Sequence, residues 1–143
     1  MFMIIISLDI RGLGGETKMR YVRNLISKEG AKLVCIQETK TNSMLDAKYF
    51  LLWGDSNIGW LHNEGVDKVG SMLTMWHKEV FNYDNHITRK DFIVMFGQHI
   101  KSKRNISMVN VYAPCNMVEN NILWEGLHNI KLANLIYKWC FFE

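Results

Sequence analysis

Two short apolar runs open the chain, and each of them ends in an acidic residue. The first run covers Phe2 to Asp9 (FMIIISLD), and the second covers Lys32 to Glu38 (KLVCIQE). Their length and their content of β-branched residues predict two buried strands.

The segment between these runs has the features of a turn followed by a helix. Arg11 to Gly15 (RGLGG) predicts a glycine-rich turn, apolar residues recur at helical spacing from Glu16, and Gly30 supplies a stop signal. Strands joined by a helix are normally parallel, so their carboxyl ends meet at one edge of the sheet. We therefore expect Asp9 and Glu38 to lie together at that edge.

The rest of the chain predicts one further short helix, a series of hairpins, a long helix and a last strand. The short helix is expected over Ser43 to Leu52, and the long helix carries Leu123, Leu127 and Ile130 on one face. The closing strand is expected from Trp139 to Phe142. Four strands in antiparallel hairpins are predicted over Gly70–Trp76, Val80–Thr88, Asp91–Ile100 and Asn105–Tyr112.

Composition places the chain among single globular domains. It has 143 residues, of which 48% are hydrophobic and 22% charged, with a formal net charge of +3. Three separated cysteines support neither a disulfide framework nor a zinc site and fit a reducing compartment. The apolar start is too short for a membrane span, so no membrane partner is expected. Basic residues between Lys18 and Lys28 and between Lys101 and Arg104 are interpreted as a solvated helix face and a hairpin tip.

Asp9 and Glu38 are the first candidate site. Magnesium is commonly held by one or two carboxylates together with water, and a pair at one sheet edge could supply them. On geometry alone, two ordinary solvated acids at strand ends are the more frequent arrangement.

The glycine turn and one tyrosine are weaker candidates. Gly12 and Gly14 match the start of a dinucleotide-binding fingerprint, but Thr17 stands where the third glycine belongs. A simple strand-to-helix turn explains them better, and no small-molecule cofactor is expected. Tyr112 ends a predicted strand, where it could donate a hydrogen bond to a phosphate or simply cap the core.

Taken together, four segments resemble a known family. Ser7 to Gly15 (SLDIRGLGG) resembles the S-W-N-I-R-G-L-G opening of endonucleases from plant LINE-type (non-LTR) retrotransposons, and Ile36 to Lys40 resembles their Q-E-T-K segment. Asn110 to Cys115 (NVYAPC) is similar to N-V-Y-A-P, and Gly70 to Trp76 (GSMLTMW) to G-G-x-L-x-x-W. These segments occur in the family's order and at about its spacing.

The resemblance implies an endonuclease/exonuclease/phosphatase domain, an α/β sandwich of two packed sheets with outer helices. It implies Mg²⁺-dependent phosphodiester hydrolysis, with DNA as the partner and a nuclear role in the relatives. Glu38 matches the metal-binding glutamate and Tyr112 the tyrosine beside the scissile phosphate. Asp9 takes the place of an asparagine beside the metal, and its extra charge would attract metal but repel phosphate.

The family's later G-D-F-N and S-D-H segments have no counterpart after Glu143. We therefore expect residues 1–143 to form one truncated, incomplete sandwich that is inactive alone and self-associates through exposed apolar edges. The alternative is a non-catalytic remnant that binds metal or nucleic acid.

Overall fold

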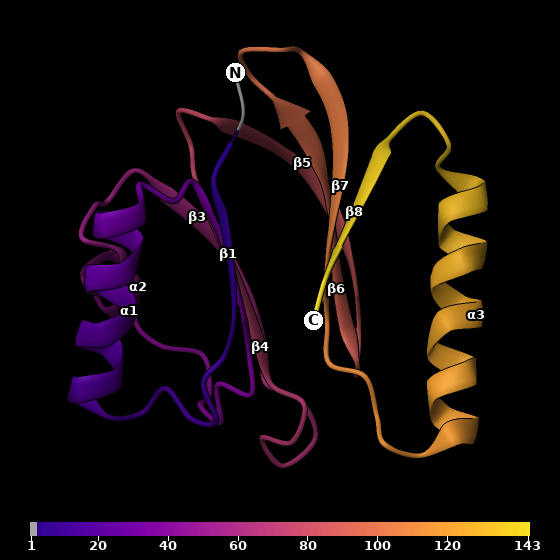
Figure 1. Ribbon diagram of the computed structural model, residues 1–143, viewed down its shortest axis with the longest axis horizontal. Coiled ribbons are helices and arrows are strands. Elements are labelled where there is room, and N and C mark those ends of the chain that lie inside the picture. The colour runs from indigo at the N-terminus through magenta and orange to yellow at the C-terminus, as the bar shows by residue number, and fades with distance from the viewer. Residues whose placement is uncertain (1–2) are drawn as a thin grey trace.

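The chain folds into two four-stranded sheets packed face to face, with helices on the outside (Figure 1). A computed structural model describes residues 3–143, so Phe2, where the first predicted strand begins, lies outside the described residues. The predicted fold class, an α/β sandwich of two sheets with outer helices, is confirmed. None of the helices described in residues 3–143 is long and apolar enough to cross a membrane.

The first sheet contains the two strands that end in acids. Its order is β1 (Ile5–Asp9), β2 (Leu33–Gln37), β4 (Met72–His77) and β3 (Ile58–Asn63). β1 and β2 are parallel, as predicted, while β4 is antiparallel to both of its neighbours. The register sets Asp9 opposite Gln37, so Glu38 follows immediately beyond the same edge.

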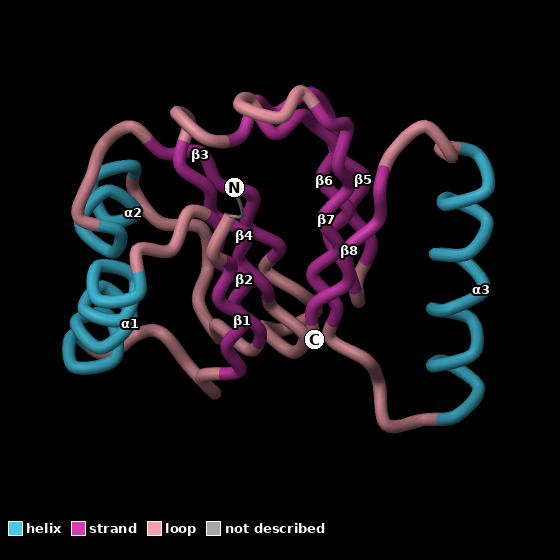
Figure 2. Tube along the Cα trace, turned by 45° about the horizontal axis from the view of Figure 1, so that its top comes forward, coloured by secondary structure: helices cyan, strands magenta, loops and turns pink. Residues whose placement is uncertain are grey.

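Helices α1 (Glu16–Glu29) and α2 (Asp46–Trp53) cover the outer face of this sheet (Figure 2). α1 ends at Gly30, which adopts φ 64° and donates its backbone N–H to the last carbonyls of the helix. α2 begins three residues later than predicted. The two residues at which the helix was expected to begin donate their backbone N–H groups to side chains, Ser43 to Glu64 and Met44 to the Tyr49 hydroxyl.

The second sheet is formed by the last three of the four strands predicted in hairpins and by the last strand. The first of the four, Gly70–Trp76, was wrongly grouped with them, because as β4 it pairs with β2 and β3 in the first sheet. The order of the second sheet is β5 (Phe81–Arg89), β6 (Phe92–His99), β7 (Arg104–Val111) and β8 (Lys138–Phe142). The first three are antiparallel, and β8 pairs parallel with β7 after the crossover helix α3 (Met117–Ala133). α3 covers the face of this sheet that points away from the first sheet (Figure 2).

β3 is an element that the sequence pattern did not predict. Gly59 interrupts its apolar pattern, and glycine inside a strand often marks the close approach of another group. A Cβ atom at this position would lie 2.4 Å from the ring of Trp76, so the strand and that ring can only be neighbours because the residue is glycine.

Three apolar layers hold the molecule together. One lies between the first sheet and α1 and α2, another between the second sheet and α3, and the third between the sheets. The middle layer contains Leu33, Trp76, Phe81 and Met95, all of them buried. The sheets are therefore fixed against each other, which fixes the ends of β1, β2 and β7 as well.

Candidate active site

Asp9, Glu38 and Tyr112 meet at one edge of the sandwich. Asp9 is the last residue of β1, Glu38 follows β2, and Tyr112 follows β7 of the other sheet. The Tyr112 hydroxyl donates a 2.6 Å hydrogen bond to Oε1 of Glu38. The carboxyl of Asp9 lies beside that of Glu38, and each shifts the pKa of the other. The structure thus brings together all three predicted site residues, while their chemical roles stay predictions.

The two neighbouring carboxyls have pKa values shifted in opposite directions. Burial raises the pKa of Asp9, and the neighbouring Glu38 raises it further. The hydrogen bonds from Asp9 and Tyr112 lower the pKa of Glu38, and the charges of Lys40 and Arg11 act in the same direction. Glu38 is therefore the stronger acid of the pair and the first of the two to ionise as pH rises.

Tyr112 stays protonated throughout the physiological range. Its hydrogen bond to Glu38, together with burial, raises the pKa of its phenol to about 12. The hydroxyl can therefore act as a hydrogen-bond donor beside the two carboxyls, but not as a base.

The loops that carry the acids are tied to each other by backbone hydrogen bonds. The N–H of Gly12 donates to the carbonyl of Glu38 at 2.7 Å, and that of Leu13 donates to Thr39 at 2.7 Å. Arg11, Glu38 and Lys40 all have positive φ values, at 50°, 54° and 52°. Such backbone costs about 1–3 kcal/mol per residue and tends to collect at functional sites.

A buried polar network lies between the two sheets, next to the strand ends that carry Glu38 and Tyr112. The Asn110 amide donates to the carbonyls of Ile36 and Leu73 and to the Thr74 hydroxyl, and its Oδ1 accepts from Gln37 at 2.8 Å. Asn110 is two residues before Tyr112, and Gln37 is next to Glu38, so this network couples the two sheets directly under the site.

A second support, which the sequence pattern did not reveal, involves His62. Its Nδ1 lies 2.7 Å from the Tyr49 hydroxyl, and its Nε2 lies 3.3 Å from Oγ1 of Thr39. Burial lowers the pKa of His62, which favours the neutral ring. His62 thus connects α2 to the loop of Glu38, a contact between segments far apart in the sequence.

The donors at this edge fit a magnesium ion. Within residues 3–143, no three or more His, Cys, Asp or Glu side chains gather as a metal site, and this edge offers the two carboxyls of Asp9 and Glu38. Magnesium usually keeps several waters and is held by one or two carboxylates, which these two provide. The basic cluster from Lys101 to Arg104 lies at the other end of β7 from Tyr112 and takes no part in the site.

Solved structures share this fold at low sequence identity. TDP2 of D. rerio complexed with a single-strand DNA product matches with a TM-score of 0.66 and 15% identity, over 96% of this chain and 58% of that chain. AP endonuclease LMAP from Leishmania major matches with a TM-score of 0.57 and 15% identity, over 84% and 42% of the two chains. The human Nocturnin catalytic domain with bound sulfate gives a TM-score of 0.61 and 12% identity, over 89% and 58%.

This chain thus spans 42% to 58% of the length of those three chains. No family model matches the sequence, and no curated protein does. The structural likeness nevertheless establishes the architecture: the chain has an endonuclease/exonuclease/phosphatase-type fold.

Proposed function

We propose that this chain carries the metal-binding part of a Mg²⁺-dependent DNA phosphodiesterase, of the kind found in plant LINE-type retrotransposons. The observation that carries the proposal is the meeting of Asp9, Glu38 and Tyr112 at one edge, with the 2.6 Å bond from Tyr112 to Glu38. The resemblance of the segments around these residues to the retrotransposon endonucleases supports the choice of substrate.

In this proposal Glu38 and Asp9 hold the metal, and Tyr112 contacts the phosphate. A bound Mg²⁺ would polarise the phosphate and stabilise the leaving oxygen. Glu38 is suited to its role because its lowered pKa keeps it charged, and the Tyr112 phenol is a donor available to a phosphate oxygen. Arg11 and Lys40, whose charges act on Glu38, would oppose the repulsion between the phosphate and the acidic pair.

Asp9 works against turnover. It adds a second carboxyl where the resembled family has an asparagine, and a like charge close to a phosphate disfavours its binding. The sequence also contains neither G-D-F-N nor S-D-H, which supply catalytic groups in that family. We therefore propose that the chain by itself binds metal and DNA without efficient cleavage.

A nicking assay tests the lack of turnover. Supercoiled plasmid is incubated with the purified chain and Mg²⁺, and the relaxed form is quantified. The proposal expects no catalytic nicking. Multiple-turnover nicking by the chain that Glu38→Gln abolishes and Glu79→Gln preserves would contradict it. Glu79 is a matched control, since it is an exposed carboxyl on the turn between β4 and β5.

DNA binding is tested separately by fluorescence anisotropy with a labelled oligonucleotide. Phosphate contacts release counterions, so the binding constant should fall steadily as salt rises. Absence of binding at low salt would remove the nucleic-acid part of the proposal and leave only a metal-binding remnant.

We also propose that the chain self-associates along β8. Among residues 3–143, β8 is hydrogen-bonded only to β7, and such free edges tend to pair with other chains. Phe141 is 41% exposed and lies beside Trp124, which is 38% exposed. Sedimentation velocity should show a concentration-dependent dimer that Phe141→Lys converts to monomer. A monomer at all concentrations would contradict the proposal.

A further inference from the structure

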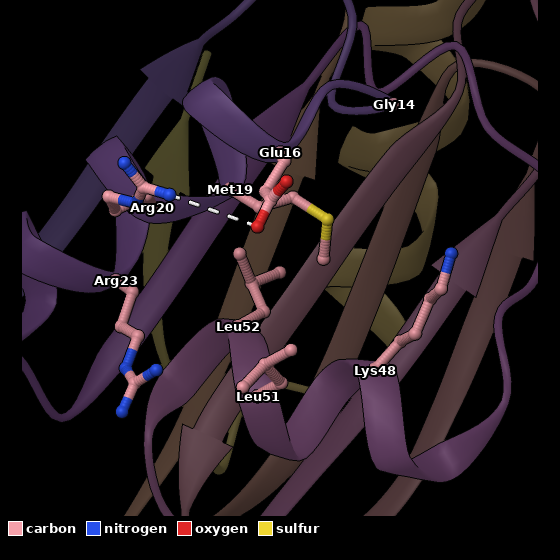
Figure 3. Close-up of a pocket in the computed structure, with 8 residues that line it drawn as sticks. All are labelled: Gly14, Glu16, Met19, Arg20, Arg23, Lys48, Leu51 and Leu52. Atoms are coloured by element: carbon pink, nitrogen blue, oxygen red, sulfur yellow. Dashed lines mark ion pairs between the residues drawn. The ribbon is translucent and has the colours of Figure 1, made fainter.

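A groove separates α1 and α2 on the outer face of the first sheet, away from the acidic pair. It has a volume of about 450 Å³ and begins at Gly14, in the loop after β1 (Figure 3). Met19, Leu51 and Leu52 form its apolar part. Leu51 is 59% exposed although it belongs to a helix that packs on the core, so an anchor side chain is left open to solvent.

The rim of the groove is basic on both sides. Arg20 and Arg23 come from α1, and Lys48 comes from α2 (Figure 3). Glu16 is the acidic residue among those that line the groove, and it makes a 3.8 Å ion pair with Arg20. That pair is exposed and therefore weak, so the rim keeps a positive charge that an acidic partner could neutralise.

The side chain of Arg23 reaches the carboxyl end of α2. A Cβ atom at Gly54 would lie 3.2 Å from Nε of Arg23, so the guanidinium stem rests against the glycine that ends α2. Arg20 and Arg23 are both exposed, so the two cations are open to a partner.

The prediction of a solvated helix face for this part of α1 is confirmed, since Arg20 and Arg23 are exposed. Both arginines also line the groove, together with Lys48 of α2 and the apolar residues between the helices. An apolar floor that is open to solvent and has cations on both sides has the properties of a recognition groove.

The chemistry of the floor selects the kind of partner. Proteins that bind single-stranded nucleic acid stack the bases on aromatic side chains, and the residues that line this groove include none. Methionine and leucine instead accept the apolar face of an amphipathic helix, and arginine and lysine pair with acids on its flanks.

We propose that the α1–α2 groove binds an acidic amphipathic helix of a partner protein. Apolar anchors of the partner enter between Met19 and Leu51, and its carboxylates face Arg20, Arg23 and Lys48. The inference does not depend on the proposed nuclease function, because the groove shares none of its residues with the Asp9–Glu38 pair.

The probe is a fluorescent synthetic helix of about 15 residues, long enough to be helical, with leucine along one face and glutamate elsewhere. Its affinity for the full chain is measured by anisotropy. The double variant Arg20→Glu/Lys48→Glu should weaken binding about tenfold, and added salt should weaken binding to the unchanged chain. Leu51→Ser should also weaken it, without unfolding the chain, because Leu51 is exposed.

Matched controls separate the groove from general charge effects. The variant Lys101→Glu/Arg104→Glu makes the same change in net charge, in the turn before β7 and at its first residue, and should bind the probe like the unchanged chain. A peptide with lysine in place of glutamate should not bind.

Three results would overturn the inference. They are equal affinity of the groove variant and the control variant, equal binding of the lysine peptide, and displacement of the probe by single-stranded DNA at the groove. The last result would mean that the basic rim serves nucleic acid instead.

Discussion

The Tyr112 hydroxyl donates to Glu38 across the two sheets, although the residues are 74 positions apart. This bond joins the end of β7 to the end of β2 and is one of the causes of the lowered pKa of Glu38. Formation of the proposed site therefore depends on the docking of both sheets, not on either sheet alone.

Tyr112→Phe should raise the pKa of Glu38. The substitution removes a hydrogen bond that stabilises the charged carboxylate and leaves the ring in place. NMR titration of the Glu38 carboxyl carbon measures the change. Tyr21→Phe, at an exposed tyrosine of α1, is the control and should leave the Glu38 pKa where it was. An unchanged Glu38 pKa in Tyr112→Phe would show that the bond does not form in solution.

Asn110→Ala should destabilise the fold by about 1–3 kcal/mol, because it leaves buried partners in the first sheet, on β2 and β4, unsatisfied. Urea unfolding measures the free energy of unfolding. Asn105→Ala on the same strand is the control, and since Asn105 is exposed its effect should stay within about 0.5 kcal/mol. Equal effects of the two substitutions would rule out the network as a link between the sheets.

His62 should make stability fall in mild acid. Burial lowers its pKa below the ordinary value of 6.5, so the unfolded chain binds the proton more readily than the folded one. The stabilisation is complete above 6.5 and is lost as pH falls through the lower pKa of the folded state.

Urea midpoints at neutral and mildly acidic pH measure the loss. His62→Gln should show a smaller fall than the unchanged chain, and His128→Gln, at an exposed position of α3, should show the full fall. A fall of the same size in His62→Gln would place its origin elsewhere.

Two glycines should respond in opposite ways to alanine. Gly126 lies within α3, and a Cβ atom there meets nothing within 4 Å, so Gly126→Ala should stabilise by about 0.5–1 kcal/mol. At Gly97 the Cβ atom would lie 2.4 Å from the Asn82 carbonyl oxygen, so Gly97→Ala should destabilise by about 1–3 kcal/mol. Thermal melts rank the two variants, and the reverse order would contradict the packing of β5 on β6.

Local patterns predicted the elements that depend on nearby residues. The strand–helix–strand opening, the stop at Gly30 and the meeting of Asp9 with Glu38 follow from periodicity and from the parallel rule. β3 was not predicted, because a glycine within a strand lowers its strand propensity. The presence of Gly59 is understood only from its contact with the ring of Trp76, which belongs to another strand.

Contacts between segments far apart in the sequence could not be predicted from local patterns. The contact of His62 with Tyr49 and Thr39 joins three segments, and the positive φ of Glu38 belongs to a residue type with no preference for it. The groove could not be predicted from the sequence, because Arg20 and Lys48 line it from two different helices whose packing the sequence pattern does not give.

Metal binding at the acidic pair is the central claim, and paramagnetic NMR with Mn²⁺ in place of Mg²⁺ tests it directly. The account predicts that substoichiometric Mn²⁺ broadens the amide signals around Asp9, Glu38 and Tyr112 first, and that Glu38→Gln removes this effect while Glu79→Gln does not. Broadening centred on other acids, or unchanged in Glu38→Gln, would contradict the account.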